Sequence, residues 1–237
     1  MALTLVFFAN ALAANIQNDR GMYPKYTQFI ERDRYALLYD GARKIPVWVY
    51  EHLDKEKLQR DKVFQIPFKA DDRVYRLHRS YGSDYKGSGY DRGHLAARAN
   101  HLSSHSSATD TFYLSNVAPQ VPAFNRGIWA ALERYCRELV LKAECESVEV
   151  ISGPLFLPKN EAGKRYVKYE VIGKNDVAVP THFFKVIYAR NCGITKTETY
   201  VIPNHWAGFR PLNDHLESLE YLEKASGLIF AKPKQAY

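Results

Sequence analysis

Short runs of aromatic and β-branched residues, separated by turn-forming residues, recur along much of the chain. Tyr35–Asp40 and Ile45–Tyr50 are two such runs, and Gly41 stands between them. Brief apolar runs of this composition are typical of strands, and the short connection predicts a β-hairpin. The same criteria predict four later strands: Val148–Gly153, Tyr166–Ile172, His182–Tyr188 and Thr197–Ile202.

A different periodicity begins at Asn125. Apolar residues recur there every three or four positions and fall on one stripe of a helix: Ile128, Trp129, Leu132, Tyr135, Cys136, Leu139 and Val140. This spacing predicts an amphipathic helix with one buried face. A second amphipathic segment, Leu216–Lys224, ends close to Gly227, a residue type that commonly terminates helices, and is also predicted to be helical.

The order of these elements indicates the fold class. The predicted strands cluster and pair locally around a few helices, instead of alternating with helices as in a βαβ fold. We therefore expect an α+β fold with a mainly antiparallel central sheet flanked by helices. The segment from Asn15 to Tyr237 contains no internal repeat and no linker-like stretch, so residues 15–237 are expected to form one domain.

The first fourteen residues, MALTLVFFANALAA, are apolar and end in small residues. Ala11-Leu12-Ala13 matches the small-x-small pattern of a signal-peptidase site, but no basic residue precedes the apolar stretch and no arginines of a transit peptide are present. The segment is also short for a membrane-spanning helix. We interpret residues 1–14 as an apolar leader of an exported (periplasmic or secreted) or organellar protein, whose mature domain is not expected to insert stably into a membrane. A buried first element is the alternative.

Composition narrows the function only slightly. The 33 basic and 26 acidic residues give a formal net charge of +7, which favours polyanionic partners without identifying one. Cys136, Cys145 and Cys192 form no CxxC pair, so a zinc site built from thiolates is not expected. Cys136 lies on the apolar stripe and is predicted to be buried. A disulfide between Cys145 and Cys192 stays open.

The residues with the clearest catalytic potential are Asp91-Arg92-Gly93-His94, within GSGYDRGHLAARANH. Histidine accepts a proton near neutral pH, arginine offers planar donors that match phosphate oxygens, and glycine permits close approach of the backbone to a polyanion. Phosphodiester hydrolysis requires a base to activate water and groups that stabilise charge on phosphorus. A lone histidine at a strand end is more often structural, so the motif predicts phosphate chemistry only together with residues farther along the chain.

Those residues follow in DTFYLSNVAPQ at 110–120 and NRGIWAALERYCR at 125–137. Together with DRGH they resemble the DNA/RNA non-specific endonuclease family, whose active site is a ββα-metal finger. The chain is most similar to the endonuclease G branch and the related mitochondrial exonuclease-like branch. The resemblance extends over roughly residues 35–230, including GPLFLP at 153–158 and VAVPTHFFKV at 177–186.

The resemblance implies a role for each matching residue. His94 would be the general base, and Asn125 would be the only direct protein ligand of a magnesium ion, with manganese as the alternative ion. Glu133 would hold the water shell of the metal. Magnesium prefers oxygen ligands and dehydrates reluctantly, which is consistent with a single protein ligand.

Three further residues complete the implied site. Arg92 and Arg137 would contact phosphate, and Asn116 would support the site by orienting the histidine. On one regular helix, Asn125 and Glu133 would be about 12 Å apart along the axis. Either Asn125 lies in the loop that enters the helix, or Glu133 acts through water, and the resemblance favours the second alternative. The i,i+4 spacing of Glu133 and Arg137 also fits an ordinary surface ion pair.

One position departs from the family pattern. Family members usually carry an upstream arginine that binds the scissile phosphate, whereas Phe64 stands at the expected position here, with Arg60 and Lys62 nearby. We leave this role unassigned. His101 and His105 lie close to the motif in sequence, but neither is expected to bind a metal. Further candidates for the missing phosphate contact are Arg73, Arg76 and Arg79.

The sequence thus predicts a magnesium-dependent, sugar-non-specific endonuclease that acts on DNA and RNA and leaves 5′-phosphate and 3′-hydroxyl ends, as the resemblance implies. The family also implies a homodimer and makes the mitochondrial intermembrane space the alternative to export. Two other functions stay open. One is a mainly 5′-to-3′ exonuclease of the same family, and the other is a nucleic-acid-binding module without catalysis, against which the presence of every motif residue argues.

Overall fold

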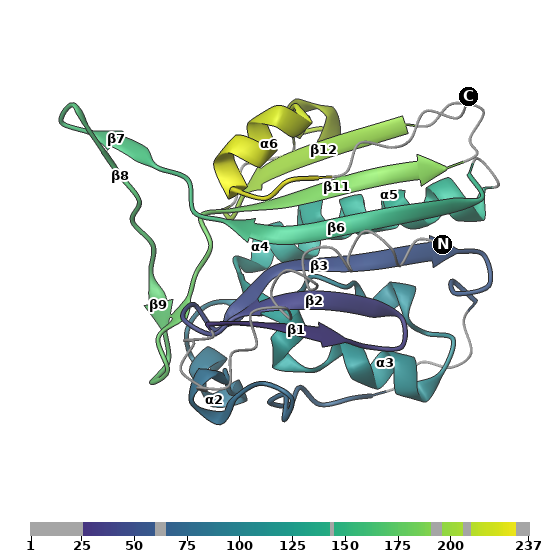
Figure 1. Ribbon diagram of the computed structural model, residues 1–237, viewed down its shortest axis with the longest axis horizontal. Helices are drawn as coiled ribbons and strands as arrows, with labels where there is room; N and C mark the ends of the chain where they lie inside the picture. The colour runs from purple at the N-terminus through teal and green to yellow at the C-terminus, as the bar shows by residue number, and fades with distance from the viewer. Residues whose placement is uncertain (1–25, 60–64, 143–144, 191–195, 206–209, 231–237) are drawn as a thin grey trace, which may run out of the picture.

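A six-stranded antiparallel sheet forms the centre of the molecule (Figure 1). The computed structural model describes residues 26–59, 65–142, 145–190, 196–205 and 210–230. The strands lie in the order β1-β2-β3-β6-β11-β12, and each neighbouring pair is antiparallel. Their bounds are Thr27–Glu31, Tyr35–Asp40, Ile45–Asp54, Ser147–Leu155, His182–Arg190 and Lys196–Pro203.

The predicted hairpin, Tyr35–Asp40 with Ile45–Tyr50, is present as β2 and β3. Asp40 stabilises its turn, because Oδ1 accepts backbone hydrogen bonds from Ala42 (2.8 Å) and Arg43 (3.1 Å). β3 continues beyond the predicted end and pairs with β6 along its outer half. The hairpin thereby becomes part of the central sheet.

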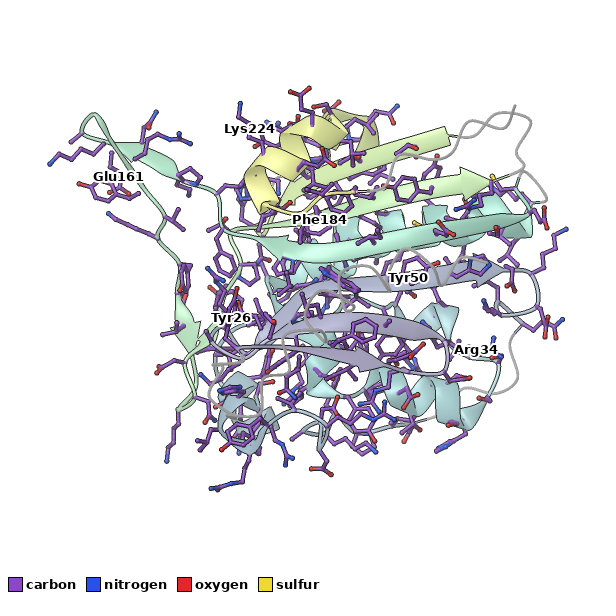
Figure 2. The ribbon with its side chains drawn as sticks, in the orientation of Figure 1. Tyr26, Arg34, Tyr50, Glu161, Phe184 and Lys224 are labelled. Carbon is purple, nitrogen blue, oxygen red and sulfur yellow. The ribbon has the colours of Figure 1, made fainter. Side chains whose placement is uncertain are left out.

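Helices cover both faces of this sheet. α5 (Ala130–Leu141) packs on one face, and α6 (Leu219–Ser226) packs on the other, over β11 and β12 (Figure 1). Alternate residues of β11 supply the two cores: Phe183 belongs to the cluster beneath α5, and Phe184 to the cluster with Leu222 of α6 (Figure 2). The predicted α+β fold, a mainly antiparallel sheet flanked by helices, is confirmed.

The helix predicted from Asn125 is present, but it starts earlier and is irregular. It begins as α4 (Pro122–Phe124), continues through a π-helical turn (Asn125–Trp129) and becomes α5. Gly127 leaves helical geometry, with φ −101° and ψ −107°. A π turn holds more residues than an α turn, so a search for a 3.6-residue period does not reveal it. The buried residues of α5 match the predicted stripe: Leu132, Cys136, Leu139 and Val140.

The prediction of one strand over Tyr166–Ile172 is wrong. Two short strands, β8 (Lys164–Tyr166) and β9 (Val171–Ile172), lie there instead. β8 pairs with β7 (Lys159–Glu161) in a hairpin that projects from the body of the molecule, as Figures 1 and 2 show, and β9 pairs with β10 (Val177–Ala178). Residues 164–171 are all exposed, so the apolar alternation seen in the sequence faces solvent and not a core.

The C-terminal helix begins later than predicted. The Ser218 side chain accepts a hydrogen bond from the Tyr221 backbone nitrogen (3.0 Å), which caps α6 at its first residue. The residues immediately before the cap follow a 3₁₀ turn (Leu212–His215). Gly227 adopts φ 73° and ends the helix, as predicted.

The smaller elements lie between β3 and α5. They are the 3₁₀ turns Arg76–His78, Arg98–Asn100 and Leu114–Asn116, the helices α2 (Gly82–Tyr85) and α3 (His105–Thr111), and the strands β4 (Asp91–His94) and β5 (Val117–Gln120). Among the described residues, no helix has the length and apolar character needed to cross a membrane.

Several predictions fall on residues that the structure does not describe. The leader (residues 1–14), the segment 60–64 that contains Phe64, and Cys192 lie outside the described residues, so the domain bounds stay a prediction. Cys136 is free and buried, as expected from its place on the apolar stripe. Cys145 is disulfide-bonded.

Candidate active site

The strand that carries DRGH, β4, forms an antiparallel ladder with β5, and the chain then enters α4, the π turn and α5. Two short strands followed by a helix give the ββα arrangement expected of the active site. Trp129 of the π turn donates its Nε1–H to the carbonyl oxygen of His94 (3.2 Å). This contact fixes the beginning of the helix relative to the strand.

Arg92 and His94 project from the same face of β4, as alternate residues of a strand do. Both lie against Phe68: its ring centroid is 5.1 Å from that of His94 and 5.5 Å from Cζ of Arg92. Phe112 flanks the imidazole at 5.1 Å, and Arg92 donates to the carbonyl oxygen of Gly82 (3.2 Å). The predicted base and one predicted phosphate ligand are therefore neighbours.

The imidazole of His94 is neutral at pH 7. Burial, with the positive charge of Arg98 and the neighbouring His101, lowers its pKa to about 4, and Glu51 opposes this shift only in part. The residue keeps partial exposure, and its Nε2 has no hydrogen-bond partner among the described residues. A neutral imidazole with an unengaged nitrogen is the form that accepts a proton.

Gly93 faces the other side of β4 and has a packing role. A Cβ at this position would lie 2.1 Å from the side chain of Gln120, which is fully buried on β5. The sequence interpretation, that glycine here admits a polyanion to the backbone, is therefore replaced by a steric one. Gly93 leaves room for Gln120 and so allows the two strands to pair.

Asp91 organises the beginning of the helix. Its carboxylate accepts hydrogen bonds from Nδ2 of Asn125 (2.9 Å) and from Nε and a terminal nitrogen of Arg126 (2.9 and 2.7 Å). Although partial burial opposes ionisation, these hydrogen bonds lower the pKa of Asp91. An ionised carboxylate thus holds the predicted metal ligand in one orientation.

The orientation of the Asn125 amide suits a hard cation. Because Nδ2 donates to Asp91, Oδ1 occupies the other branch of the amide and is the atom suited to a metal. Within the described residues, no three His, Cys, Asp or Glu side chains are placed to hold an ion together. Magnesium needs few direct protein ligands, because it retains several waters. One amide oxygen at this position fits such an ion.

Glu133 and Arg137 lie on α5, beyond the π turn from Asn125. Asn125 has helical backbone geometry and does not lie in a loop before the helix. The path between Asn125 and Glu133 includes the π turn and the non-helical Gly127, so their separation does not follow from regular helix geometry, and the role of Glu133 stays a prediction. Burial raises the pKa of Glu133 to about 7. Lys185 and Arg137 oppose this shift, and Glu51 adds to it.

A buried polar network that the sequence interpretation missed lies beside these residues. Oε1 of Glu51 is 2.9 Å from both Nδ2 of Asn100 and Nε2 of His101. Although burial opposes ionisation, the contacts with His101 help to lower the pKa of Glu51. Oδ1 of Asn100 accepts a hydrogen bond from Arg137 (3.0 Å). Asn100 therefore links a buried carboxylate to a predicted phosphate ligand.

Lys185 of β11 is the cation of this buried region. It is 1% exposed, donates to Oγ of Ser152, and has its Nζ 4.4 Å from the Trp129 ring centroid. Lys185 and Glu51 both occupy strand positions whose neighbours two residues away are buried and apolar. Burial of a charged group is costly without compensating contacts. A charged residue at an inward-facing strand position was therefore the sequence feature that could have revealed this network.

Asn116 acts on the segment that follows the base. It is fully buried, and its Oδ1 accepts a hydrogen bond from the Ala96 nitrogen (2.8 Å). Its Nδ2 donates to the carbonyl oxygens of Ala96 and Thr111 (3.0 Å each), and its own carbonyl oxygen accepts from Leu95 (3.0 Å). These bonds are to backbone atoms and not to the imidazole, so any effect of Asn116 on His94 is indirect.

Arg98 is a second residue that the sequence interpretation missed. Of the proposed substitutes for the upstream arginine, Arg73 and Arg79 donate to backbone carbonyl oxygens and have structural roles. Arg98 lies near enough to His94 to lower its pKa, and its Cζ is 5.7 Å from the Phe112 ring centroid. It is therefore the better candidate for an additional phosphate contact.

A family model described as DNA/RNA non-specific endonuclease matches residues 18–236. The chain belongs to the DNA/RNA non-specific endonuclease family. The resemblance predicted from DRGH and the two following runs is confirmed. The ββα-metal site of this family implies a divalent metal ion, and the family acts on nucleic acids.

Relatives within the DNA/RNA non-specific endonuclease family share most of this chain. Human mitochondrial endonuclease G is 49% identical over 211 residues, covering 87% of this chain and 70% of that protein. Human mitochondrial nuclease EXOG is 42% identical over 203 residues, covering 83% of this chain and 55% of that protein. A solved chain from the EndoG/EndoGI complex, described as showing the mechanism of EndoG inhibition, superposes with a TM-score of 0.82 at 41% identity, covering 88% and 87% of the two chains.

Proposed function

We propose that the protein is a magnesium-dependent endonuclease that cuts DNA and RNA without sugar specificity and leaves 5′-phosphate and 3′-hydroxyl ends. One arrangement carries the proposal. Neutral His94 and Arg92 share a face of β4, and the same strand holds the Asn125 amide through Asp91. Base, phosphate ligand and metal ligand are the three components that the hydrolysis needs.

His94 accepts the proton of the attacking water. Its pKa is low partly because of the charge on Arg98. A bound phosphate offsets that charge, so the pKa of His94 rises when substrate occupies the site and the imidazole becomes a stronger base. Arg92 and Arg137 hold the phosphate oxygens, for which the planar guanidinium is well suited.

Asn125 would hold a metal ion through Oδ1, and Glu133 would order the water around that ion. A bound divalent cation would neutralise charge at the scissile phosphate and the leaving oxygen. We propose magnesium, with manganese as the alternative, because the donors are oxygen atoms. A cation near Glu133 also favours its ionised form, against the effect of burial. Asn116 supports the site by holding the segment after His94.

The proposal extends to assembly and compartment. We propose a homodimer, as the family resemblance implies, and the basic net charge of +7 supports sequence-tolerant binding through phosphates. The two human relatives are named as mitochondrial, which favours the mitochondrial alternative over export through the apolar N-terminus. A leader at residues 1–14 and a single domain at 15–237 stay part of the proposal.

A mainly 5′-to-3′ exonuclease is the second candidate function. It is favoured by the 42% identity to nuclease EXOG, although the chain spans only 55% of that relative. The proposed chemistry at phosphorus is the same in both cases. The difference lies in whether chain ends or interiors reach His94.

Supercoiled plasmid incubated with the protein and MgCl₂ separates these functions. We expect nicked and then linear plasmid, with activity abolished by EDTA. His94→Ala should retain its circular dichroism spectrum and retard the plasmid without cutting it. Cleavage restricted to linear DNA would establish the exonuclease, and retardation without cleavage by the wild type would leave only a binding module. Wild-type cutting by His94→Ala would refute the proposed base.

A further inference from the structure

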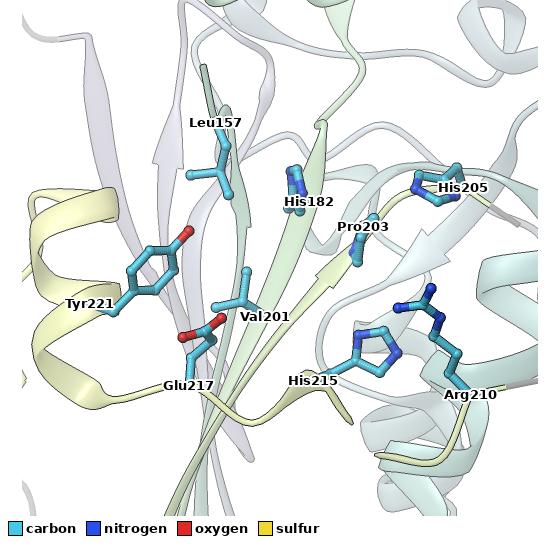
Figure 3. A pocket seen from close by; sticks show the side chains of 9 residues that line it. All are labelled: Leu157, His182, Val201, Pro203, His205, Arg210, His215, Glu217 and Tyr221. Carbon is cyan, nitrogen blue, oxygen red and sulfur yellow. The ribbon is translucent and has the colours of Figure 1, made fainter. Parts of the chain in front are cut away.

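A cavity of about 560 Å³ lies on the α6 side of the sheet (Figure 3). Leu157 and Val201 of its lining belong to the apolar cluster that includes α6, whereas the proposed catalytic helix α5 packs against the other cluster. The rest of the lining comes from β11, the end of β12, and His205, Arg210, His215, Glu217 and Tyr221. The cavity is thus separate from the proposed nuclease site, and its volume is typical of a small-molecule site.

The two ends of this cavity differ in chemistry. Arg210, His215 and His205 line one side in Figure 3, and Tyr221 and Glu217 line the other with apolar neighbours. The carboxylate of Glu217 opposes an anion, but it lies apart from the Arg210 guanidinium in this view. A ligand with one anionic end and one aromatic or apolar end matches this division.

The basic side chains affect one another's ionisation. Burial, with His205 and Lys159, lowers the pKa of His182 to about 4. Burial and Arg210 lower the pKa of His215, and Asp214 opposes that shift. Burial is the main cause of both shifts, and repulsion from neighbouring basic groups adds to it. An anion placed among them relieves this repulsion.

His215 gives an independent indication of a ligand. It is 7% exposed, lines the cavity, and has an Nε2 atom without a hydrogen-bond partner among the described residues. A buried polar atom that makes no hydrogen bond costs free energy, and such atoms in folded proteins call for a physical reason. Protein atoms enclose Nε2 in this structure, so the ring must turn toward the cavity for this nitrogen to reach a bound anion.

We propose that this cavity binds a nucleoside monophosphate. The phosphate lies among His182, Arg210 and His215, and the nucleoside lies toward Tyr221, whose ring offers a stacking surface for the base. Glu217 at that end can accept hydrogen bonds from ribose hydroxyl groups. The assignment goes beyond the proposed nuclease activity, whose exhaustive action would generate ligands of this class.

Binding should be coupled to proton uptake. A phosphate dianion stabilises the protonated forms of His182 and His215, so affinity increases as the pH falls toward about 6, where the phosphate group itself takes up a proton. The other ionisable groups around these rings are Lys159, His205, Arg210, Asp214, Glu217 and Tyr221. Of these, Lys159 and Arg210 attract the anion, whereas Asp214 and Glu217 repel it.

Calorimetric titration of the full chain in EDTA tests the proposal at pH 6.5 and pH 8, where the phosphate of AMP is mainly a dianion. AMP should bind more tightly at the lower pH, inorganic phosphate should bind at least tenfold more weakly than AMP, and adenosine should not bind. Arg210→Gln should weaken AMP binding at least tenfold. Lys224→Gln, which removes an exposed charge on α6 outside the lining, should leave it unchanged.

A variant of the proposed nuclease site completes the test. Arg137→Gln should leave AMP affinity unchanged, and Arg210→Gln should cut plasmid at the wild-type rate. AMP binding that is lost in Arg137→Gln but kept in Arg210→Gln would overturn the cavity site, as would no binding at either pH. Equal affinity for inorganic phosphate and AMP would overturn the nucleoside assignment. A protein that binds AMP in this pattern yet cuts no plasmid would refute only the nuclease proposal.

Discussion

Burial and the proposed function place opposite demands on the carboxyl group of Glu133. Its pKa is raised from 4.5 to about 7, so the folded protein favours the protonated form. The resulting contribution to stability is full below pH 4.5 and is lost as the pH rises through about 7. A role near a metal ion requires the ionised form instead. Stability therefore falls between about pH 4.5 and pH 7, and Glu133 becomes competent as this loss is completed.

Glu133→Gln separates the two demands. In EDTA, we expect the variant to have a higher Tm than the wild type at pH 8 and a similar Tm at pH 5, because glutamine does not ionise. Its plasmid-nicking rate in magnesium should fall by about tenfold or more. Glu138→Gln on the same helix, where the carboxylate is partly exposed, should change neither property. An equal Tm difference at both pH values would contradict titration of Glu133 near pH 7.

Asp91 holds Asn125 and Arg126 together, which provides a matched pair of variants. Asn125→Ala removes the proposed metal ligand, so the magnesium concentration at half-maximal nicking should rise by about tenfold or more and the maximal rate should fall. Arg126→Gln keeps Asn125 and removes the ion pair of Asp91 with a largely exposed guanidinium, so it should change the magnesium dependence much less. If both variants show the wild-type midpoint, Asn125 is not the ligand.

At the scale of elements, the β4–β5 ladder depends on the absence of a side chain at Gly93. A methyl group there would meet Gln120 at 2.1 Å, so the strands of Gly93→Ala must move apart or the glutamine must be displaced. We expect urea denaturation to show a loss of about 1–3 kcal/mol, with a lower nicking rate because His94 is displaced. Gly93→Ala combined with Gln120→Ala should lose less than the sum of the two single variants. Additive losses would exclude the steric explanation.

Local periodicity explains which elements the sequence could predict. The β2–β3 hairpin and the stripe of α5 depend on contacts between near neighbours, and their patterns are visible in the chain. The π turn at Asn125–Trp129 breaks the period that would reveal it. Residues 164–171 also alternate between apolar and polar types, but they are exposed and no core lies beneath them. Whether such an alternation is buried depends on tertiary packing, which a local pattern does not contain.

The candidate site also contains residues that the sequence could predict and residues that it could not. His94 and Asn125 were predictable because a family motif marks them, and their neighbourhood follows from one short strand and one helix. Glu51 and Lys185 stand on strands far apart in sequence and meet the site only through pairing of β3, β6 and β11. Asn100 lies close to the motif in sequence, but its hydrogen bond with Arg137 could be recognised only when the position of α5 was known.

At the scale of the whole molecule, the two proposed sites use opposite faces of one sheet. β11 joins them, because its alternate residues belong to the core beneath α5 and to the core beneath α6. Lys185 faces the first core, and His182 lines the cavity on the second side. The sheet thus separates the proposed cleavage site from the proposed nucleotide site, and β11 contributes residues to both sides.

The net charge of +7 predicts how nucleic acid binding responds to salt. With His94→Ala, which should bind without cutting, we expect affinity for a random-sequence oligonucleotide to fall about tenfold or more between roughly 50 and 200 mM salt, because phosphate contacts release counterions. DNA and RNA of one sequence should show similar slopes. Fluorescence anisotropy measures both, and an affinity that does not change with salt would refute phosphate-based binding.

Cys136 gives the catalytic helix a chemical reporter. Its thiol lies in the core beneath α5, where burial raises its pKa to about 12. Because alkylating reagents attack the exposed thiolate, they modify Cys136 only when α5 separates from the sheet. The labelling rate therefore reports how often the helix that carries Glu133 and Arg137 separates from the sheet. Any ion or nucleic acid that stabilises the packing of this helix protects the cysteine from the reagent.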